Sequence, residues 1–422
     1  MYNQGLSLDQ APPITVVLRF FLSVPLFGLL LSLLMMLTPA EILTPSHPYS
    51  LAAIHLMVLG VITMSMIGAL FQMQSVLGGR PIPAPAGNGL IIHTFLTIGV
   101  LSLAGAFGFG FPPLFIIAAV MLGAAILHAA NLVLPLLFGG IIHDTLRGMR
   151  LALISLAVTA ILGIVMAVSY ANGMFSPSHD AIRTLHYSLG LIGWIGALII
   201  AVAFQVIEMF YVASPYSSWC KRNAFRIIAA SLALKGLWLF AALPYGWIFD
   251  GVIAALLTGF VVTTAKRLRM RKRRVSDVSI WFWGMGVALL QLSLIAHITY
   301  LYRGEMAIEA VALIAFFFFA LSIILGMMGK IVPFLVWFHL SSQGFMDAPI
   351  MSTIIPRNQL IITFWLFVLT AAFALVSPLY SEALRIAGLT AAAMFAMVFT
   401  NLIGATNVYR HTLAHGTRFE QL

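Results

Sequence analysis

The chain has very few charged residues and a single cysteine. Asp, Glu, Lys and Arg together make up 8% of its 422 residues, whereas 62% are hydrophobic and the mean hydropathy is +1.05. Soluble domains do not have this balance, so the sequence predicts a polytopic, all-α membrane protein that forms one transmembrane domain over residues 1–422. The one cysteine, Cys220, excludes an internal disulfide and any metal site built from several thiolates.

Long apolar stretches account for nearly the whole chain and leave no room for a soluble domain. A helix that crosses a bilayer needs about 20 apolar residues, and twelve stretches meet this requirement. The predicted spans are 14–38, 51–77, 88–110, 112–137, 149–172, 181–212, 224–243, 247–265, 278–302, 306–337, 357–376 and 383–408. No small-residue cleavage site follows the first stretch, so we expect a membrane helix there and not a removed signal.

The positive charges are distributed unevenly between the two faces of the predicted membrane protein. Of the 22 Lys and Arg residues, sixteen lie in loops after even-numbered helices or in the C-terminal tail, and only three lie on the opposite face. The positive-inside rule then places both termini in the cytoplasm, and we expect the inner membrane of a bacterium. Topology therefore explains the net charge of +10, which argues against a nucleic-acid partner. The basic run 266–274 could also touch anionic lipid.

Two stretches of the chain repeat each other at an offset of 131 to 133 residues. The shared features are a Thr/Ser-Pro-Ser-His motif (44–47 and 176–179), a histidine within the following helix (His55 and His186) and a Phe-Gln pair that ends at Gln72 and Gln205. A weaker third copy lies along span 306–337, where Lys330 replaces the glutamine. These repeats predict three four-helix arcs, about 14–137, 149–265 and 278–408, related by pseudo-threefold symmetry.

Five histidines are predicted in the outer half of the membrane: His47, His55, His179, His186 and His297. The first two are eight residues apart and the next two seven, so each pair lies on one helix face, about 10–12 Å apart along the axis. Imidazole is a common ligand of haem iron and copper, and an ionisable group inside a membrane is a functional candidate by default. The alternative is a neutral histidine that forms a hydrogen bond between helices.

Charged side chains also fall within predicted helices, at Glu208, Lys235 and Lys330. We expect Glu208 to form a compensating ion pair with Lys330 or Lys235, which is the least costly way to hold either charge in a bilayer. The alternative is a proton path through these groups together with Gln72 and Gln205.

Tyr300 lies three residues after His297 and therefore on the same helix face. Its phenol could donate a proton or take part in redox chemistry beside the histidine. The alternative is that it belongs to the aromatic belt at the membrane interface.

Four segments carry a resemblance to a known family: 55–61, 66–72, 186–194 and 329–339. With twelve helices and histidines in the second and sixth, the chain resembles the haem–copper oxidase subunit I superfamily, above all its short single-subunit members. It is also similar to the NnrS family of haem- and copper-associated proteins linked to nitric oxide stress. The resemblance implies that His55 stands at a haem-ligand position and His186 near a copper-ligand position.

The chain departs from the oxidases at the remaining ligands. Active oxidases carry a His-His pair in helix 7 and a His-x-His motif in helix 10, and neither occurs here. The resemblance therefore implies a b-type haem protein, with copper as a further candidate, and no oxygen reduction coupled to proton pumping. The ligands would come from His47, His55, His179, His186 and His297, and Arg183 or Arg303 would pair with the haem propionates.

Several functions remain open at this stage. A haem protein of this kind would act in electron transfer, in O₂ or NO binding, or in haem or metal handling, and its role as an oxidoreductase is undecided. It would need a redox partner protein, and it could form a homo-oligomer. The alternatives are a secondary transporter of a small solute or metal without a bound cofactor, and a structural subunit whose histidines are relics.

Overall fold

The computed structural model describes residues 10–38, 46–138, 144–272 and 277–418, and over these ranges the fold is all-α. Twelve helices are long and apolar enough to cross a membrane, which confirms the twelve predicted spans. They are α1 (Ile14–Leu37), α2–η3–α3 (Pro48–His55, Leu56–Thr63, Met64–Gly78), α4 (Pro85–Phe109), α5 (Pro113–Phe138), α6 (Asp144–Asn172), α7–η4–α8 (His179–Ser188, Leu189–Gly196, Ala197–Phe210), α9 (Ser218–Phe240), α10 (Trp247–Arg269), α11 (Val278–Arg303), α12 (Met306–Ser341), α14 (Arg357–Val376) and α15 (Ala383–His415). A short helix, α13 (Met351–Ile354), precedes α14.

Polar residues and glycines set the helix ends. The Ser217 hydroxyl accepts a hydrogen bond from the backbone N–H of Cys220 at the start of α9, and the Asp277 carboxylate accepts one from the N–H of Ser279 at the start of α11. Helix α11 ends at Gly304, whose φ of 72° suits a residue without a Cβ. Between such ends the helices satisfy their own backbone hydrogen bonds, as a segment in hydrocarbon must.

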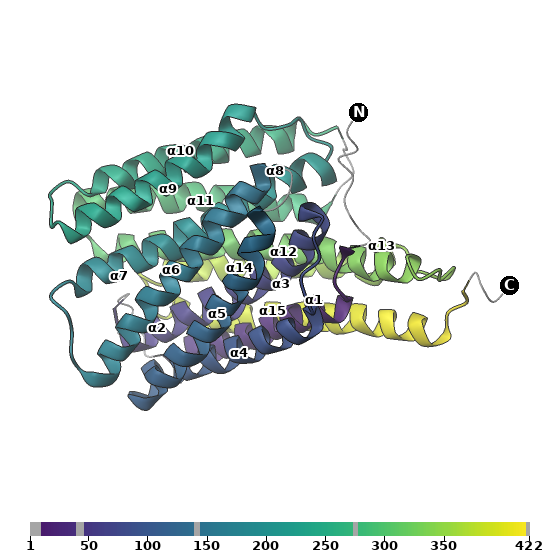
Figure 1. The fold of residues 1–422 in the computed structure, drawn as a ribbon, viewed down its shortest axis with the longest axis horizontal. Coiled ribbons are helices and arrows are strands. Elements are labelled where there is room, and N and C mark those ends of the chain that lie inside the picture. The colour runs from purple at the N-terminus through teal and green to yellow at the C-terminus, as the bar shows by residue number, and fades with distance from the viewer. Residues whose placement is uncertain (1–9, 39–45, 139–143, 273–276, 419–422) are drawn as a thin grey trace.

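Every fourth membrane helix lies at the centre of the bundle. The second, sixth and tenth helices are 72%, 72% and 83% buried over their most apolar windows, whereas the other nine are 28–56% buried. Figure 1 shows α12, the tenth, inside the bundle, with α9 and α10 along one edge and α4 along the opposite edge. The spacing of four agrees with the period of the repeat, and the pseudo-threefold symmetry itself stays a prediction.

The first and last helices close the bundle by packing against each other (Figure 1). Glycines make this contact close: a Cβ at Gly28 would lie 2.4 Å from the ring of Phe395, and one at Gly388 would lie 2.7 Å from Met36. Small residues at such crossings let two helices approach in a membrane, where lipid tails provide no hydrophobic driving force between them.

The two central helices that carry the repeated histidines share a local distortion. Each contains a π-helical stretch, η3 and η4, and the two stretches begin 133 residues apart. Within them, the indole N–H of Trp194 donates a 3.0 Å hydrogen bond to the hydroxyl of Thr63, so the two helices meet at this level. Single π turns inside α-helices often occur beside functional groups, and here each lies within three residues of a histidine, His55 or His186.

Candidate functional site

His55 and His186 lie near each other inside the bundle. Each is on a central helix, seven residues from that helix's first residue at the predicted outer end, and is therefore about 10 Å below it. The two rings are close enough to interact electrostatically. The structure thus brings together the two histidines that the repeat singled out.

Both rings are held through the same nitrogen. Nδ1 of His55 lies 2.7 Å from the carbonyl oxygen of Leu51, and Nδ1 of His186 lies 2.9 Å from that of Thr159. A carbonyl can only accept, so Nδ1 carries the proton in each ring and the Nε2 lone pair is left available. Histidines that bind a metal usually show this arrangement, because the bond at one nitrogen fixes the ring for ligation through the other.

The surroundings of the pair are apolar and tightly fitted. The His55 ring stacks on Phe107 with centroids 5.7 Å apart. His186 packs against α6 at Gly163, where an added Cβ would lie 3.1 Å from the ring atom Cε1. A ring held between a helix backbone and a carbonyl keeps one orientation, which is what a preorganised ligand requires.

An aromatic cluster extends from His55 toward the predicted outer end. Phe107 contacts Phe115 and Tyr170, at 4.9 and 5.6 Å between centroids, and Tyr170 in turn contacts His179 at 6.1 Å. His179 is thus linked to His55 through this cluster. The sequence analysis did not single out Phe107 or Tyr170, because an isolated aromatic residue in an apolar helix carries no distinguishing pattern.

His47 is the N-cap residue of α2. Its Nδ1 accepts a hydrogen bond of 3.2 Å from the backbone N–H of Tyr49, so the imidazole caps the helix, and its ring stacks on the Tyr49 ring. Because Nδ1 accepts this bond, a neutral His47 carries its proton on Nε2, the reverse of His55 and His186.

Four further predicted residues gather in a second place, which we call the outer polar cluster. It lies between α7, α9, α10, α11 and α12 at the predicted outer end and consists of Arg183, Tyr187, Lys235, Asp250, His297, Tyr300 and Glu309. The sequence analysis named Arg183, Lys235, His297 and Tyr300 but missed the other three. Asp250 could have been found, since it is the one acidic residue in span 247–265.

An ion pair forms the base of the outer polar cluster. Lys235 Nζ lies 2.6 Å from Asp250 Oδ1, and the two side chains are only 6% and 16% exposed. His297 interacts electrostatically with both of them, and the phenol of Tyr300 lies near the carboxylate of Glu309. The pair replaces the expected partnership of Lys235 with Glu208.

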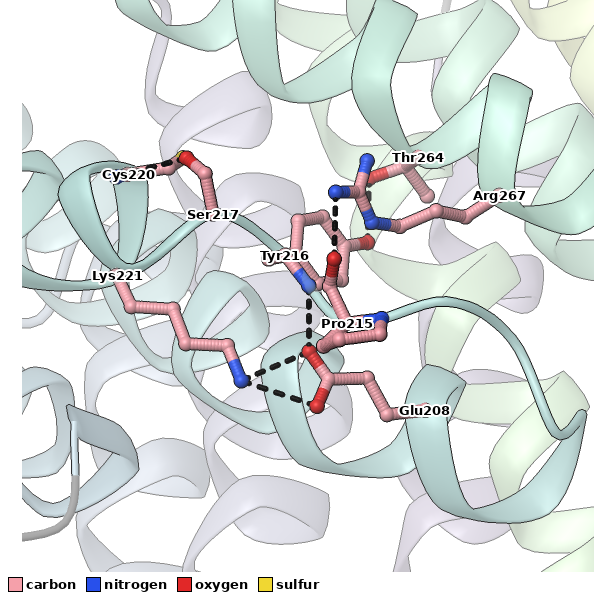
Figure 2. Close-up of polar contacts among 8 residues, drawn as sticks. All are labelled: Glu208, Pro215, Tyr216, Ser217, Cys220, Lys221, Thr264 and Arg267. Atoms are coloured by element: carbon pink, nitrogen blue, oxygen red, sulfur yellow. Dashed lines mark hydrogen bonds and ion pairs between the residues drawn. The ribbon is translucent and has the colours of Figure 1, made fainter.

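Glu208 lies at the opposite end of the bundle and has a different partner. Figure 2 shows its carboxylate between the ammonium of Lys221, at 2.8 Å, and the backbone N–H of Tyr216, at 2.7 Å. The prediction that Glu208 pairs with Lys330 or Lys235 is therefore wrong. The short loop between α8 and α9 folds back toward the last turn of α8, so a nearby residue of the chain neutralises the carboxylate.

The same loop is attached to α10 through Tyr216 (Figure 2). The Tyr216 and Thr264 hydroxyls are hydrogen bonded at 2.8 Å, and the Arg267 guanidinium lies 4.2 Å from the centre of the Tyr216 ring and donates to the carbonyl oxygen of Pro215. Burial raises the pKa of the Tyr216 phenol far above its usual range. The phenol therefore stays neutral, and the contacts are structural.

Lys330 also finds an acid that the sequence analysis did not name. Its ammonium forms an ion pair with Asp277 and lies 5.4 and 5.1 Å from the ring centres of Phe210 and Tyr211. Burial by itself would raise the pKa of the Asp277 carboxyl, but hydrogen bonds from Lys330 and Ser279 outweigh it and hold this pKa below its usual range. The pair joins α12 to the start of α11.

The matched glutamines lie in the half of the bundle remote from the histidines. Gln72 is buried, and its side-chain oxygen has no hydrogen-bond partner among the described residues, whereas Gln205 is half-buried. An unpaired buried amide oxygen is a usual place for an ordered water. A proton path through the glutamines stays a prediction.

The two outer arginines each have an acidic neighbour. Arg183 pairs with Asp180 at 3.1 Å and Arg303 with Glu305 at 2.7 Å, with every one of these side chains more than half exposed. Both could still turn toward a propionate, because a guanidinium has five donors and an exposed ion pair is weak.

Comparisons with known proteins leave the family open. No protein-family model matches the chain, and no curated protein matches it in sequence. In the part of the chain that the structure describes, no three His, Cys, Asp or Glu side chains gather as a metal site.

Proposed function

We propose that the protein is a b-type haem protein of the membrane and that His55 and His186 would hold its iron. One observation carries the proposal. The two matched histidines lie within electrostatic reach of each other on central helices, and each is fixed through Nδ1 so that Nε2 is available. Two histidines would be enough for a haem, because the porphyrin supplies the other ligands of its iron, whereas the described residues bring no third His, Cys, Asp or Glu to the pair for a copper ion.

The residues present fit this group in their chemistry. The neighbouring side chains are apolar or aromatic, as around buried haem, and Phe107 lies flat against the His55 ring. A haem held this way supplies one-electron transfer, or binding of NO or O₂ when one ligand is displaced. The protein's own residues would hold and orient the two imidazoles and exclude water. The aromatic cluster from Phe107 to Tyr170 would limit access to the haem.

Spectra of ligand variants test the assignment. H55A and H186A should each lose the Soret and α bands of a six-coordinate haem, or shift them to those of a five-coordinate one. H128A is the matched control, since His128 lies in a membrane helix too but is hydrogen bonded to Asn88 at 2.9 Å. Unchanged spectra in both H55A and H186A would refute the ligand assignment even if haem is bound.

A finer test uses the glycine that faces His186. An alanine at position 163 would press on the ring, because its Cβ would lie 3.1 Å from Cε1. G163A should therefore alter the haem spectrum or weaken haem retention without removing a ligand. G259A, where the added Cβ meets no atom within 4 Å, should have the wild-type spectrum.

A second candidate function is a secondary transporter of a small solute or metal, and the outer polar cluster favours it. Buried ionisable residues inside membrane helices mark substrate and ion pathways in many transporters. Uptake into proteoliposomes that D250N abolishes would support this function. Glu208 has a structural partner, so E208Q should leave such uptake intact.

The proposal has three further parts. The protein would receive or pass electrons through a redox partner protein, and it would form a homo-oligomer. It would lie in the inner membrane of a bacterium with both termini in the cytoplasm.

A further inference from the structure

We infer that the predicted cytoplasmic ends of α9 and α10 bind anionic phospholipid, and that four exposed cations recognise its headgroup. The four are Arg222 and Arg226 near the start of α9, and Lys266 and Arg269 in the last turn of α10. The basic run 266–274 supplies only half of them, because α9 contributes the other two. All four lie apart from the central histidine pair, so the site does not depend on the haem proposal.

The exposed face of α10 has the length and polarity of one phospholipid. Exposed residues recur every three or four positions and so form one stripe along the helix: Val252, Ala255, Gly259, Val262, Lys266 and Arg269. The apolar part, from Val252 to Val262, extends over about 15 Å along the axis. Half of a hydrocarbon core is also about 15 Å thick. An acyl chain of the inner leaflet therefore fits along this part, with its headgroup beside the two cations.

A glycine leaves open space midway along this stripe. A Cβ built at Gly259 would meet no atom within 4 Å, and the neighbouring stripe residue one turn away is an alanine, Ala255. Small residues in a membrane helix let another chain approach the backbone closely. An acyl chain can therefore lie against α10 at this level.

Helix α9 has the same pattern in the opposite direction along the chain. Its exposed stripe begins with the cations and continues with apolar residues: Arg222, Arg226, Ala230, Ala233 and Leu237. Trp219, one turn before Arg222, is 61% exposed. Tryptophan is enriched at the level of lipid headgroups, so it indicates that the cations of α9 lie at that level too.

Contacts between the two helices hold their cationic ends side by side at the edge of the bundle. Arg267, in the last turn of α10, donates a 2.8 Å hydrogen bond to the carbonyl oxygen of Pro215, three residues before α9 begins (Figure 2). Both helices lie along one edge of the bundle (Figure 1) and are only 39% and 28% buried over their most apolar windows. Much of their surface therefore faces lipid.

The positive charge at this end is not neutralised by acids. In the part of the chain that the structure describes, no carboxylate pairs with any of the four cations; Arg222 donates to the carbonyl oxygen of Ser218, and Arg226 to the side chain of Asn223. On α6, by contrast, Arg147 pairs with an aspartate at 2.8 Å. A lipid phosphate would supply the missing negative charge, and juxtamembrane clusters of Lys and Arg attract anionic lipids in this way.

Lipid titration of the full-length protein tests the site. In native mass spectra from detergent micelles, the wild type should retain phosphatidylglycerol more tightly than phosphatidylcholine with the same acyl chains, and salt should weaken this preference. K266Q/R269Q and R222Q/R226Q should each weaken phosphatidylglycerol binding about 25-fold, because each cation near anionic lipid contributes about fivefold in affinity. Binding of phosphatidylcholine should not change.

A matched variant controls for net charge. R80Q/R410Q removes two exposed cations from other elements at the same end of the bundle and should bind phosphatidylglycerol as the wild type does. K266R/R269K keeps both charges and should also match the wild type. An equal loss of affinity in R80Q/R410Q would show a response to net charge alone and would overturn the site on α9 and α10.

Two further results would also contradict the inference. The first is a wild-type protein that retains the two lipids equally, which decides the question even if the glutamine variants fail to insert. The second is displacement of phosphatidylglycerol by the same concentration of glycerol 3-phosphate, because that would indicate a site for a soluble phosphate. The inference predicts that glycerol 3-phosphate, which has no acyl chain to lie along the stripe, displaces none.

Discussion

The Lys235–Asp250 ion pair should be strongly coupled energetically, and a double-mutant cycle measures the coupling. D250N leaves a 6% exposed ammonium without an anion, and breaking a buried pair from one side costs about 3–5 kcal/mol. The site is near a helix end, where a lysine can extend toward water, so we expect about 3 kcal/mol. K235M should cost less, about 2 kcal/mol, because a buried carboxylate left without its partner can take up a proton and become neutral.

The double variant K235M/D250N buries no charge at this position and should lie within about 2 kcal/mol of the wild type. The coupling energy between the two positions is then at least about 3 kcal/mol, at the upper end for residues in contact. Reversible unfolding in mixed micelles, or thermal unfolding in nanodiscs, gives the four stabilities. A double variant that loses as much stability as the two single variants combined would show that the pair is not coupled and would refute the reasoning.

Three further predictions concern packing, the contact between the α8–α9 loop and α10, and acid stability. G28A should destabilise the protein by about 1–3 kcal/mol through the clash with a facing phenylalanine ring, whereas G259A, which meets no atom within 4 Å, should change the free energy of unfolding by less than about 0.5 kcal/mol. Y216F should cost about 1 kcal/mol through its lost hydrogen bond to Thr264, and adding T264V should cost little more; additive losses in unfolding experiments would argue against the contact. The lowered pKa of Asp277 stabilises the fold above the carboxyl's unfolded-state pKa of about 4, so Tm should fall as the pH drops below that value, and an equally steep fall in D277N would contradict this role.

The twelve membrane helices could be predicted almost completely from the sequence, because a membrane helix is specified by composition, whereas their arrangement in three symmetric arcs stays a prediction. Twenty apolar residues in a row have one stable arrangement in a bilayer, and the twelve predicted spans match the twelve observed helices to within a few residues at most ends. The largest differences are extensions at helix ends, such as α15, which continues to His415. Amphipathic or charged end turns, like the one that carries Arg410, lie outside an apolar window and are missed for that reason.

The sequence predicted that the charged side chains within the membrane form ion pairs, but it did not predict which residues they pair with. The expectation that each intramembrane charge has an opposite charge is met by Lys235, Lys330 and Glu208. Their partners come from neighbouring helices or from an adjacent loop, and hydropathy does not indicate which faces of two helices meet. Asp250 and Asp277 lie at helix starts, where an acid is also expected as a cap or dipole partner, so their pairing with buried lysines had no separate signal.

The repeat was the most informative feature for the candidate site. It selected His55 and His186 from eleven histidines, and the structure brings these two near each other with matched Nδ1 contacts. It did not show that His47 caps a helix, or that His297 belongs to another cluster. Those distinctions depend on which helices are neighbours and on side-chain direction, and both are properties of the folded bundle.

The most direct test of the haem proposal is the absorbance spectrum of the purified wild-type protein, oxidised and dithionite-reduced, with metal analysis of the same sample. The proposal predicts a Soret band, sharp α and β bands on reduction, and iron in stoichiometric amount. A colourless, metal-free protein, purified after haem supplementation during expression, would contradict it.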